Sequence, residues 1–210
     1  MVGLVGVIMV SMGGLAAGPA KSVDGSDPAG TFVTGVIYKG MGVFQDPRLT
    51  QAERDRRFAR LVEQNLDTQK IARFTLGRYW NRATEKERQD YLAVLPGYLA
   101  QAFAGRISQF AGALVQVVRT SRVDGNIHVV TRIYFIGQRP SSASTSEIEV
   151  GWLVGQTPGG LRVEDIDLEG TSLELVERTA VTSLIERNGA TVTAAINDMR
   201  VSLGQTVAGP

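Results

Sequence analysis

Apolar and polar residues follow two different periods along this chain, and the period changes near residue 113. Before that point apolar residues recur at intervals of three and four, the spacing of one face of a helix. Over 113–168 they alternate with polar residues or form short β-branched runs, which is typical of strands. Helical spacing returns over 171–203. The pattern therefore predicts an α+β fold in one domain, residues 30–204, with its helical part at 30–110.

Four helices are predicted in the helical part from apolar spacing and capping signals. Thr50 with Glu53, and Thr84 with Glu87, each fit a capping box, in which the hydroxyl and the carboxylate satisfy two free amides of the first turn. Pro96 lies inside the longest pattern and predicts a kink, not a break, because the apolar stripe keeps its phase across it. The expected spans are 30–45, 51–66, 68–77 behind a capping Asp67, and 84–110.

Four strands are predicted where the period is two. Asp124-Gly125 and the turn at Pro158 to Gly160 separate consecutive strands, and every connection is too short for a helical crossover. The sheet should therefore be mostly antiparallel, with one face on the helices. The expected spans are 114–119, 127–136, 147–154 and 161–168. The inner face should carry Ile127, Val129, Thr131, Ile133 and Phe135 of the second strand and Ile148, Val150 and Trp152 of the third.

Two further helices are predicted after the sheet. Thr171 with Glu174 fits a third capping box, and the helix that it opens should end at Asn188-Gly189, a pair that favours a left-handed C-cap. A last helix is expected over 192–203, and residues 205–210 read as a tail. Helices from both ends of the domain should thus cover a four-stranded sheet.

The N-terminus is typical of an exported protein. Residues 1–20 carry no charged side chain, and a short apolar run there is followed by the small residues of 16–20. This order is that of a secretory signal peptide, although no Lys or Arg precedes the apolar run. We expect cleavage after Ala20 and a flexible polar leader over 21–29.

Composition excludes several kinds of site. The chain has 22 basic and 21 acidic residues, a net charge of +1, so no global field draws it to nucleic acid. It has no cysteine, which excludes disulfides, thiolate metal sites and a cysteine nucleophile. Its single histidine, His128, should point away from the inner face of the sheet. The acidic residues Glu164, Asp165, Asp167 and Glu169 are expected to form a solvated strand edge and not a metal site.

One enzyme interpretation stays open. A curved antiparallel sheet closed by helices resembles the cone of nuclear-transport-factor-like proteins, in which a strand carboxylate such as Asp165 can act as a general base for isomerase or hydrolase chemistry. Tyr134 and Tyr98 are the available polar partners. The chain has no phosphate-binding glycine loop, no Gly-x-Ser-x-Gly elbow and no His-Glu-x-x-His helix. No catalytic residue is therefore assigned.

A binding protein explains the sequence better, because the chain has more aromatic and aliphatic surface than a four-stranded sheet needs. We expect a lipid-sized cavity between the longest helix and the sheet. Its lining should be Phe74, Leu76, Tyr79, Trp80, Tyr98, Phe103, Ile107, Ile133, Phe135, Val150 and Trp152. For half or more of these residues plain core packing is the alternative. Arg73, Arg78 and Arg106 flank this surface and suit bidentate hydrogen bonds to a phosphate at its rim.

Four segments carry a resemblance to a known family. They are residues 71–80, Ala83-Thr-x-x-x-Arg88, Tyr98-Leu-x-x-x-Phe103 and Glu169-Gly-x-Ser-Leu173. In order and spacing they resemble the MlaC family of periplasmic phospholipid-binding proteins, also called toluene-tolerance auxiliary proteins, over residues 46–200. Leu161 departs from the family, which commonly has an aromatic residue there.

The resemblance implies a periplasmic lipid carrier and no enzyme, with bound phospholipid as cargo and no metal or other cofactor. Such a carrier moves phospholipid between an outer-membrane lipoprotein complex and the MCE-type subunit of an inner-membrane ABC transporter, which maintains outer-membrane lipid asymmetry. A related branch of the family is linked to hopanoid lipids, so a hopanoid is the alternative cargo.

Overall fold

The computed structural model describes residues 27–123, 125–135 and 147–205. The predicted signal peptide, residues 21–26 of the predicted leader, Ile136 and residues 206–210 lie outside the described residues. The last residues expected in the leader, Pro28 and Ala29, belong to the first helix instead. The described elements are α1 (Pro28–Gln45), α2 (Gln51–Asn65), α3 (Thr68–Leu76), the 3-10 helix η1 (Gly77–Tyr79), α4 (Glu85–Gln109), β1 (Leu114–Val123), β2 (Asn126–Tyr134), β3 (Glu147–Thr157), β4 (Gly160–Leu168), β5 (Thr171–Ser172), α5 (Leu173–Arg187) and α6 (Val192–Ser202).

The strands form one open antiparallel sheet in the order β1-β2-β3-β4-β5. The predicted α+β class and antiparallel pairing are confirmed. The expected count of four strands is wrong, because the described chain adds β5 beside β4. Glu169 and Gly170 both have positive φ, 52° and 82°, and a two-residue turn of this kind matches the twist of a hairpin. It folds β5 back onto the end of β4.

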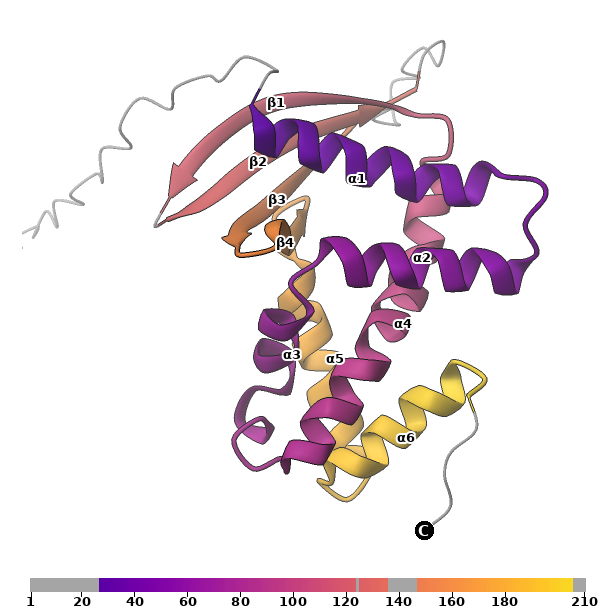
Figure 1. The fold of residues 1–210 in the computed structure, drawn as a ribbon, viewed down its shortest axis with the longest axis vertical. Coiled ribbons are helices and arrows are strands. Elements are labelled where there is room, and N and C mark those ends of the chain that lie inside the picture. Colours follow the sequence, from indigo (N-terminus) through magenta and orange to yellow (C-terminus); the bar gives the residue numbers. More distant parts are fainter. Residues whose placement is uncertain (1–26, 124, 136–146, 206–210) are drawn as a thin grey trace, which may run out of the picture.

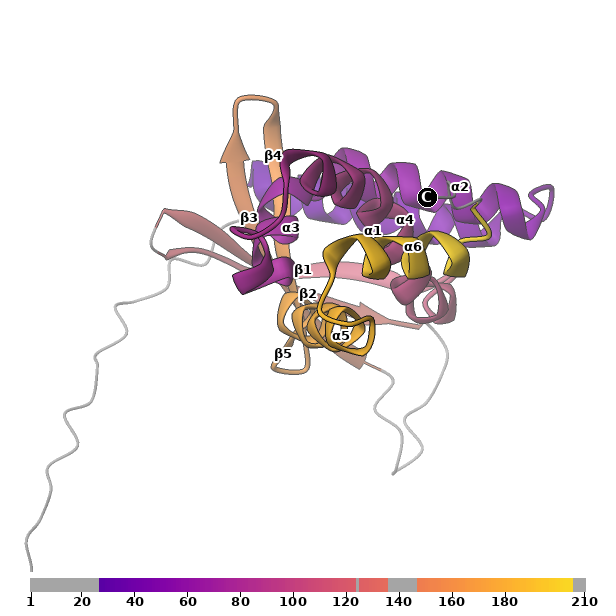
Figure 2. The same ribbon diagram turned by 90° about the horizontal axis from the view of Figure 1, so that it is seen from below.

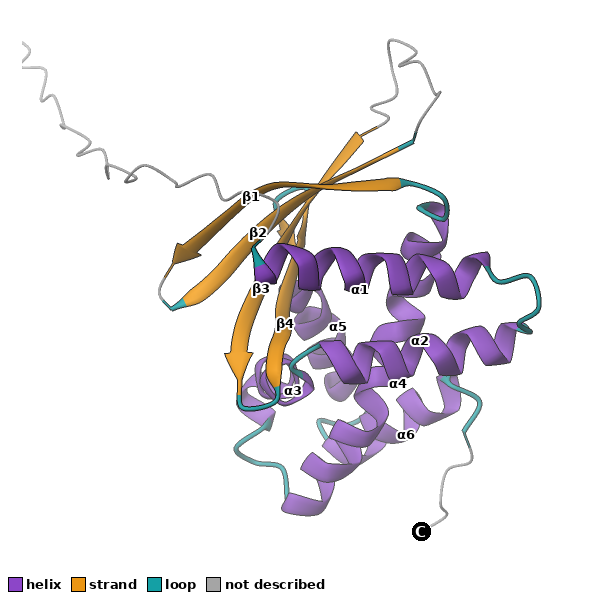
Figure 3. Cartoon of the chain, turned by 45° about the horizontal axis from the view of Figure 1, so that its top comes forward, coloured by secondary structure: helices purple, strands orange, loops and turns teal. Residues whose placement is uncertain are grey.

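Two register shifts bend the sheet. One lies in β1 between Val117 and Arg119. The other lies opposite Leu153 and Val154 of β3, where Glu164 is the additional residue of β4. Bulges of this kind increase the local twist, and Figure 3 shows the curved strands with α1 lying along them. β1 and β3 also run further than predicted, because backbone pairing continues through polar positions.

The helices lie on one side of the sheet and extend away from it. Figure 1 shows α1 and α2 side by side, with α1 next to the sheet, and α4, α5 and α6 below them. Figure 2, seen from below, shows α5 and α6 as neighbours. α2 packs on α4, and α3 packs chiefly on α5. The space that α1, α2 and α4 share therefore faces the sheet.

Hydrogen bonds fix the helix starts. The hydroxyls of Thr50 and Thr84 accept from the third amide of their helices, and the glutamate at that position reciprocates, so both capping boxes are confirmed. The box predicted at Thr171 is wrong by one residue. Ser172 caps α5 by accepting from the Leu175 amide at 3.2 Å, because Thr171 is held in β5 by its pairing with β4.

α4 is the central helix of the core and continues through Pro96. Its buried face and that of the sheet form one apolar cluster. On the sheet side the buried residues include Ile127, Val129, Thr131, Ile133, Val150 and Trp152, as predicted. His128 is exposed, which confirms its outward direction. Within the described ranges, no helix combines the length and apolarity needed to cross a membrane.

Candidate functional site

A cavity of about 90 Å³ lies between α1, α2 and α4 on one side and the inner face of β2, β3 and β4 on the other. Every accessible atom of its wall is apolar. The helix side is formed by Val36, Gly40, Met41, Phe58, Val62, Phe103 and Ile107, and the sheet side by Ile133, Val150, Trp152, Ile166 and Leu168. Such a wall offers area burial and dispersion, and it offers no directional hydrogen bond.

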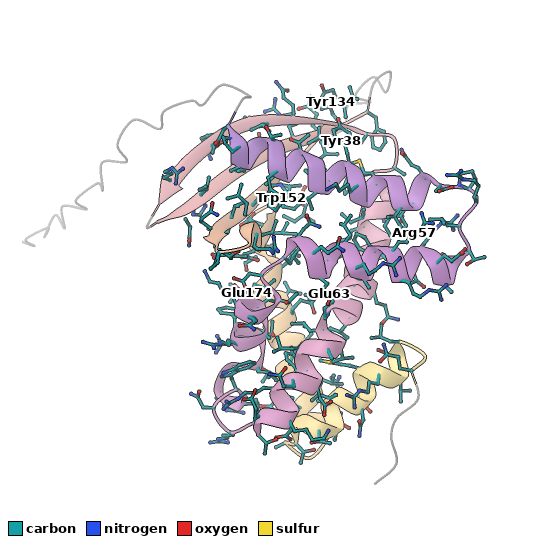
Figure 4. All side chains as sticks on the ribbon, in the orientation of Figure 1. Tyr38, Arg57, Glu63, Tyr134, Trp152 and Glu174 are labelled. Carbon is teal, nitrogen blue, oxygen red and sulfur yellow. The ribbon has the colours of Figure 1, made fainter. Side chains whose placement is uncertain are left out.

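The sheet wall is held by a buried polar link. The indole Nε1 of Trp152 donates to the Thr131 hydroxyl at 2.9 Å, and that hydroxyl donates to the Val150 carbonyl at 3.3 Å. All three residues are less than 9% exposed. Because buried donors need partners, this chain fixes the ring of Trp152 beside the cavity. Figure 4 shows Trp152 in the space between α1 and α2.

The helix wall closes at a glycine. A Cβ added to Gly40 of α1 would lie 3.6 Å from Ile107 and 3.6 Å from Phe58. These distances are ordinary van der Waals separations, so α1 packs on α4 and α2 here with room for an added methyl group. Phe58 also meets Phe44 edge to face, with ring centroids 5.2 Å apart. α1 therefore covers the cavity through close contacts near its C-terminal half.

Some of the predicted site residues meet at this cavity. Phe103 and Ile107 line it from α4, and Ile133, Val150 and Trp152 line it from the sheet. Arg106 also adjoins it, through the apolar stem of its side chain, and is exposed. The expected arrangement of the longest helix opposite the sheet thus places these residues around one space.

The other predicted lining residues lie elsewhere. Leu76 and Tyr79 are buried in the core away from the cavity, Phe135 is only partly buried, and Tyr98 lines an outer groove between α4 and α5. Phe74 packs under Arg178, whose Cζ is 4.9 Å from the ring centroid. Helical spacing marked an apolar face on α3, but it did not show that this face packs on α5 instead of the sheet.

Arg73 and Arg78 also lie away from the cavity. The guanidinium of Arg73 lies over the Trp80 ring at 5.5 Å, and Arg88 lies over the same ring at 5.4 Å. Arg78 donates to Glu186 at 2.7 Å and to the Tyr79 hydroxyl at 3.0 Å. These contacts join α3 and η1 to their neighbours by cation–π and ionic interactions. Of the three predicted rim arginines, Arg106 alone adjoins the cavity.

Sequence reasoning missed the contribution of α1 and α2. Val36, Gly40 and Met41 of α1, with Phe58 and Val62 of α2, form much of the wall. The three-and-four spacing of these residues is visible in the sequence and predicts a buried helix face. It does not predict a cavity wall, because every core-facing helix has the same spacing.

A second, small pocket adjoins the cavity and carries acidic residues. It has a volume of about 20 Å³, and Glu164, Asp165, Glu174 and Glu177 line it. The expectation that Glu164 and Asp165 form a solvated edge is wrong. Glu164 is 7% exposed and forms an ion pair with Lys70, because the bulge at this residue breaks the strict alternation of β4.

Asp165 holds the start of α5. Its carboxylate accepts from the Ser172 hydroxyl at 2.6 Å and from the Glu174 amide at 3.0 Å. It also accepts from the Ile166 amide at 2.8 Å. These three hydrogen bonds give the Asp165 carboxylate a structural role. It lies at the N-terminus of α5, where the helix dipole favours negative charge. Tyr134, at the end of β2, does not line the pocket that contains Asp165.

Burial changes the acid strength of two glutamates of α5, Glu174 and Glu177. Burial, and secondarily the charge of Asp165, raise the pKa of Glu174 to about 7. Burial also raises the pKa of Glu177, against the opposing charge of Arg106. Among the described residues, no cluster of three or more His, Asp or Glu side chains suits a metal ion.

Comparisons with known proteins agree with this geometry. A family model described as "MlaC protein" matches residues 37–201. A solved structure of a phospholipid-binding protein from Ralstonia solanacearum, in complex with a phospholipid, superimposes with a TM-score of 0.65 at 18% identity, covering 83% of this chain and 98% of that chain. At that identity the likeness shows the fold. A search of curated proteins gives no significant match.

Proposed function

The chain belongs to the MlaC family, and from this membership and its cavity we propose that it carries phospholipid with the acyl tails buried. The observation that carries the proposal is the wholly apolar wall between α1, α2, α4 and the sheet. The phospholipid bound in the Ralstonia solanacearum protein of the same fold supports it.

The size of the hydrophobic effect explains why such a carrier is needed. Exposing an acyl chain of roughly sixteen carbons to water costs about 12 kcal/mol, at about 0.8 kcal/mol per methylene. Two such chains cannot cross an aqueous gap unaided at a useful rate. A protein that buries them inside an apolar wall removes most of this cost.

Loading requires the wall to open. Pockets that hold ligands of drug size have volumes of roughly 300–1,000 Å³, whereas this cavity measures about 90 Å³. We therefore propose that α1 moves away from α4 and α2 as the acyl chains enter. The packing of Gly40 beside Ile107 and Phe58 is the contact that this movement separates.

We place the headgroup at the end of α4. Arg106 is exposed and its neighbours Ile107 and Phe110 are partly exposed, while all three adjoin the cavity. A guanidinium at the mouth of an apolar cavity suits a lipid phosphate by charge-assisted hydrogen bonds. This charge distribution favours a lipid whose acyl tails lie inside the cavity and whose phosphate lies at Arg106.

Membership of the family supports a setting for this carrier. We propose that it acts in the periplasm after removal of residues 1–20, receiving and delivering lipid between an outer-membrane lipoprotein complex and an MCE-type subunit of an inner-membrane ABC transporter. Phospholipid is the favoured cargo because Arg106 offers a partner for a phosphate. A hopanoid, which needs only the apolar wall, is the alternative.

Extraction of protein purified without detergent tests the proposal. Mass spectrometry should find intact phospholipid on the wild type, and Val150→Trp should lose most of it, because the indole fills the cavity at an overpacking cost of about 1–3 kcal/mol. Val201→Trp is the matched control, since Val201 is 62% exposed on α6. Full lipid on folded Val150→Trp would contradict the assignment of the cavity.

The same extract separates a carrier from an enzyme. An enzyme that uses Asp165 as its base would release altered lipid, and Asp165→Asn would abolish the alteration. A carrier returns intact lipid with either residue at 165. Recovery of a hopanoid in place of phospholipid would instead identify the alternative cargo.

A further inference from the structure

The small acidic pocket continues the lipid cavity. Leu66, Phe103, Ile166 and Leu173 line both spaces, so these four side chains separate them. Beyond them the lining adds Ile71, Leu99 and Val163 and, from β4 and α5, four residues that carry carboxyl groups. Figure 4 shows Glu174 below Trp152, where the sheet meets the lower helices.

Glu177 is the unusual member of this acidic group. It is 7% exposed, it faces the pocket, and the structure gives it no hydrogen bond or ion pair to any described residue. Glu174 is similar, because its Oε1 is buried without a hydrogen-bond partner among the described residues. The pocket thus holds two carboxyl groups whose hydrogen-bonding capacity the described part of the chain does not satisfy.

The charges that face these two glutamates are already engaged or lie to one side. From α3, Lys70 pairs with Glu164 of β4, and Asp165 of β4 accepts three hydrogen bonds. Arg178 of α5 lies over Phe74. From α4, the charge of Arg106 acts against the burial that raises the pKa of Glu177. Burial, and also the charge of Glu177, raises the pKa of the Tyr91 and Tyr98 phenols on the same helix. Within the described residues, neither glutamate forms an ion pair with Lys70, Arg178 or Arg106.

We propose that Glu174 and Glu177 set the length limit of the acyl chains, by placing carboxyl groups without partners beyond the four shared side chains. This inference rests on the proposed carrier function. Each methylene that enters the apolar cavity should raise affinity about fourfold. A methylene that passes the shared side chains would instead displace water from carboxyl groups that lack partners, which is unfavourable. Affinity should therefore rise with chain length and then stop rising.

Chain-length selection by purified protein tests the inference. Wild type is equilibrated with vesicles of mixed phosphatidylglycerols whose two saturated chains lengthen stepwise from dilauroyl to diarachidoyl, and the lipid retained by the protein is quantified by mass spectrometry. We expect a sharp upper limit for wild type and a limit at least two methylenes longer for Glu177→Leu. Glu186→Leu, the same change at an exposed position of α5, should keep the wild-type limit.

A measurement on wild type alone guards against misfolding of the variant. Protonation removes the charge that opposes a longer chain, and the raised pKa of both glutamates, about 7 for Glu174, brings this step into an accessible range. The length limit should shift to longer chains as pH falls from well above 7 to well below it. The shift should disappear in the double variant Glu174→Gln, Glu177→Gln.

The outcomes separate this inference from the carrier function. Lipid retained with the same limit in wild type and Glu177→Leu, or a wild-type limit that does not move with pH, overturns the role of the two glutamates and leaves the carrier intact. If wild type retains no phosphatidylglycerol of any length, the proposed carrier function fails, and the length limit fails with it.

Discussion

Two buried threonines of the sheet differ in what their hydroxyls do. Thr131 is fully buried and links Trp152 to the Val150 carbonyl. Thr120 is 3% exposed, and its hydroxyl has no partner among the described residues. Sequence cannot distinguish them, because both occupy strand positions of the same residue type. The tertiary position of one indole decides which hydroxyl stabilises the fold.

Replacing each threonine by valine should therefore give different results. Thr131→Val leaves the buried Nε1 of Trp152 without an acceptor, so the free energy of unfolding should fall by about 1–3 kcal/mol. Thr120→Val removes an unsatisfied hydroxyl and should be neutral or stabilising. Urea unfolding followed by tryptophan fluorescence measures both. Equal losses in the two variants would contradict the buried link.

Glu174 makes stability depend on pH in an unusual direction for a carboxylate. Burial and the neighbouring Asp165 raise its folded-state pKa to about 7, from an ordinary 4.5. Between these pH values the folded protein binds more protons than the unfolded chain. Its free energy of unfolding should therefore fall as pH rises through this window, and the loss should be complete above the folded pKa.

Glu174→Gln should remove this dependence. We expect the variant to be more stable than wild type above pH 7 by about 1–3 kcal/mol, with the difference shrinking towards zero near pH 4.5. Urea titrations at several pH values measure it. Glu186→Gln on the same helix serves as the control, and a parallel pH profile for Glu174→Gln and wild type would refute the assignment.

At the scale of elements, the sequence predicted where structure begins more reliably than what each element packs against. The boxes at Thr50 and Thr84 lie where local spacing predicts them, because a cap involves only residues of one turn. The start of α5 departs from this rule. There, pairing of β5 with β4 and the carboxylate of Asp165 decide the first turn.

The corrected cap gives a direct test. Ser172→Ala removes the hydroxyl that accepts from the Leu175 amide, so it should cost about 0.5–2 kcal/mol. Thr171→Ala, one residue earlier and exposed, should change the free energy of unfolding by less than about 0.5 kcal/mol. Thermal and chemical unfolding of the pair measure the difference. A larger loss at Thr171 would restore the cap expected from the sequence.

At the scale of the whole molecule, the cavity depends on three helices and a sheet brought together by the fold. α1 closes over the space that α2, α4 and the sheet enclose, and Gly40 packs beside Ile107 and Phe58. If loading separates α1 from α4, a covalent link at this contact should prevent it. The natural absence of cysteine lets a single engineered pair be read without competing disulfides.

The variant Gly40→Cys, Ile107→Cys provides that link. A Cβ at Gly40 would lie 3.6 Å from Cγ2 of Ile107. Because Cγ2 is bonded to the Ile107 Cβ, the two Cβ atoms would be at most about 5 Å apart, close to the roughly 3.5–4.5 Å that disulfides need. The oxidised form should fail to take up fluorescent phospholipid from vesicles, and reduction should restore uptake. Each single-cysteine variant serves as a control. Equal uptake by oxidised and reduced protein would show that α1 does not need to move.

The sequence by itself determined the period of each segment, the helix starts that depend on one turn, the antiparallel pairing and the inner face of the sheet, because these follow from short-range spacing and connection length. It also predicted that Phe103, Ile107, Ile133, Val150 and Trp152 face a common space, which the structure places around the cavity. Only the tertiary structure decided that α3 packs on α5, so Phe74 and Trp80 do not line the cavity. It also decided that α1 and α2 complete the cavity wall. The reason is that an apolar stripe on a helix can pack against any apolar neighbour. Contacts between elements that are distant in sequence determine which neighbour it meets.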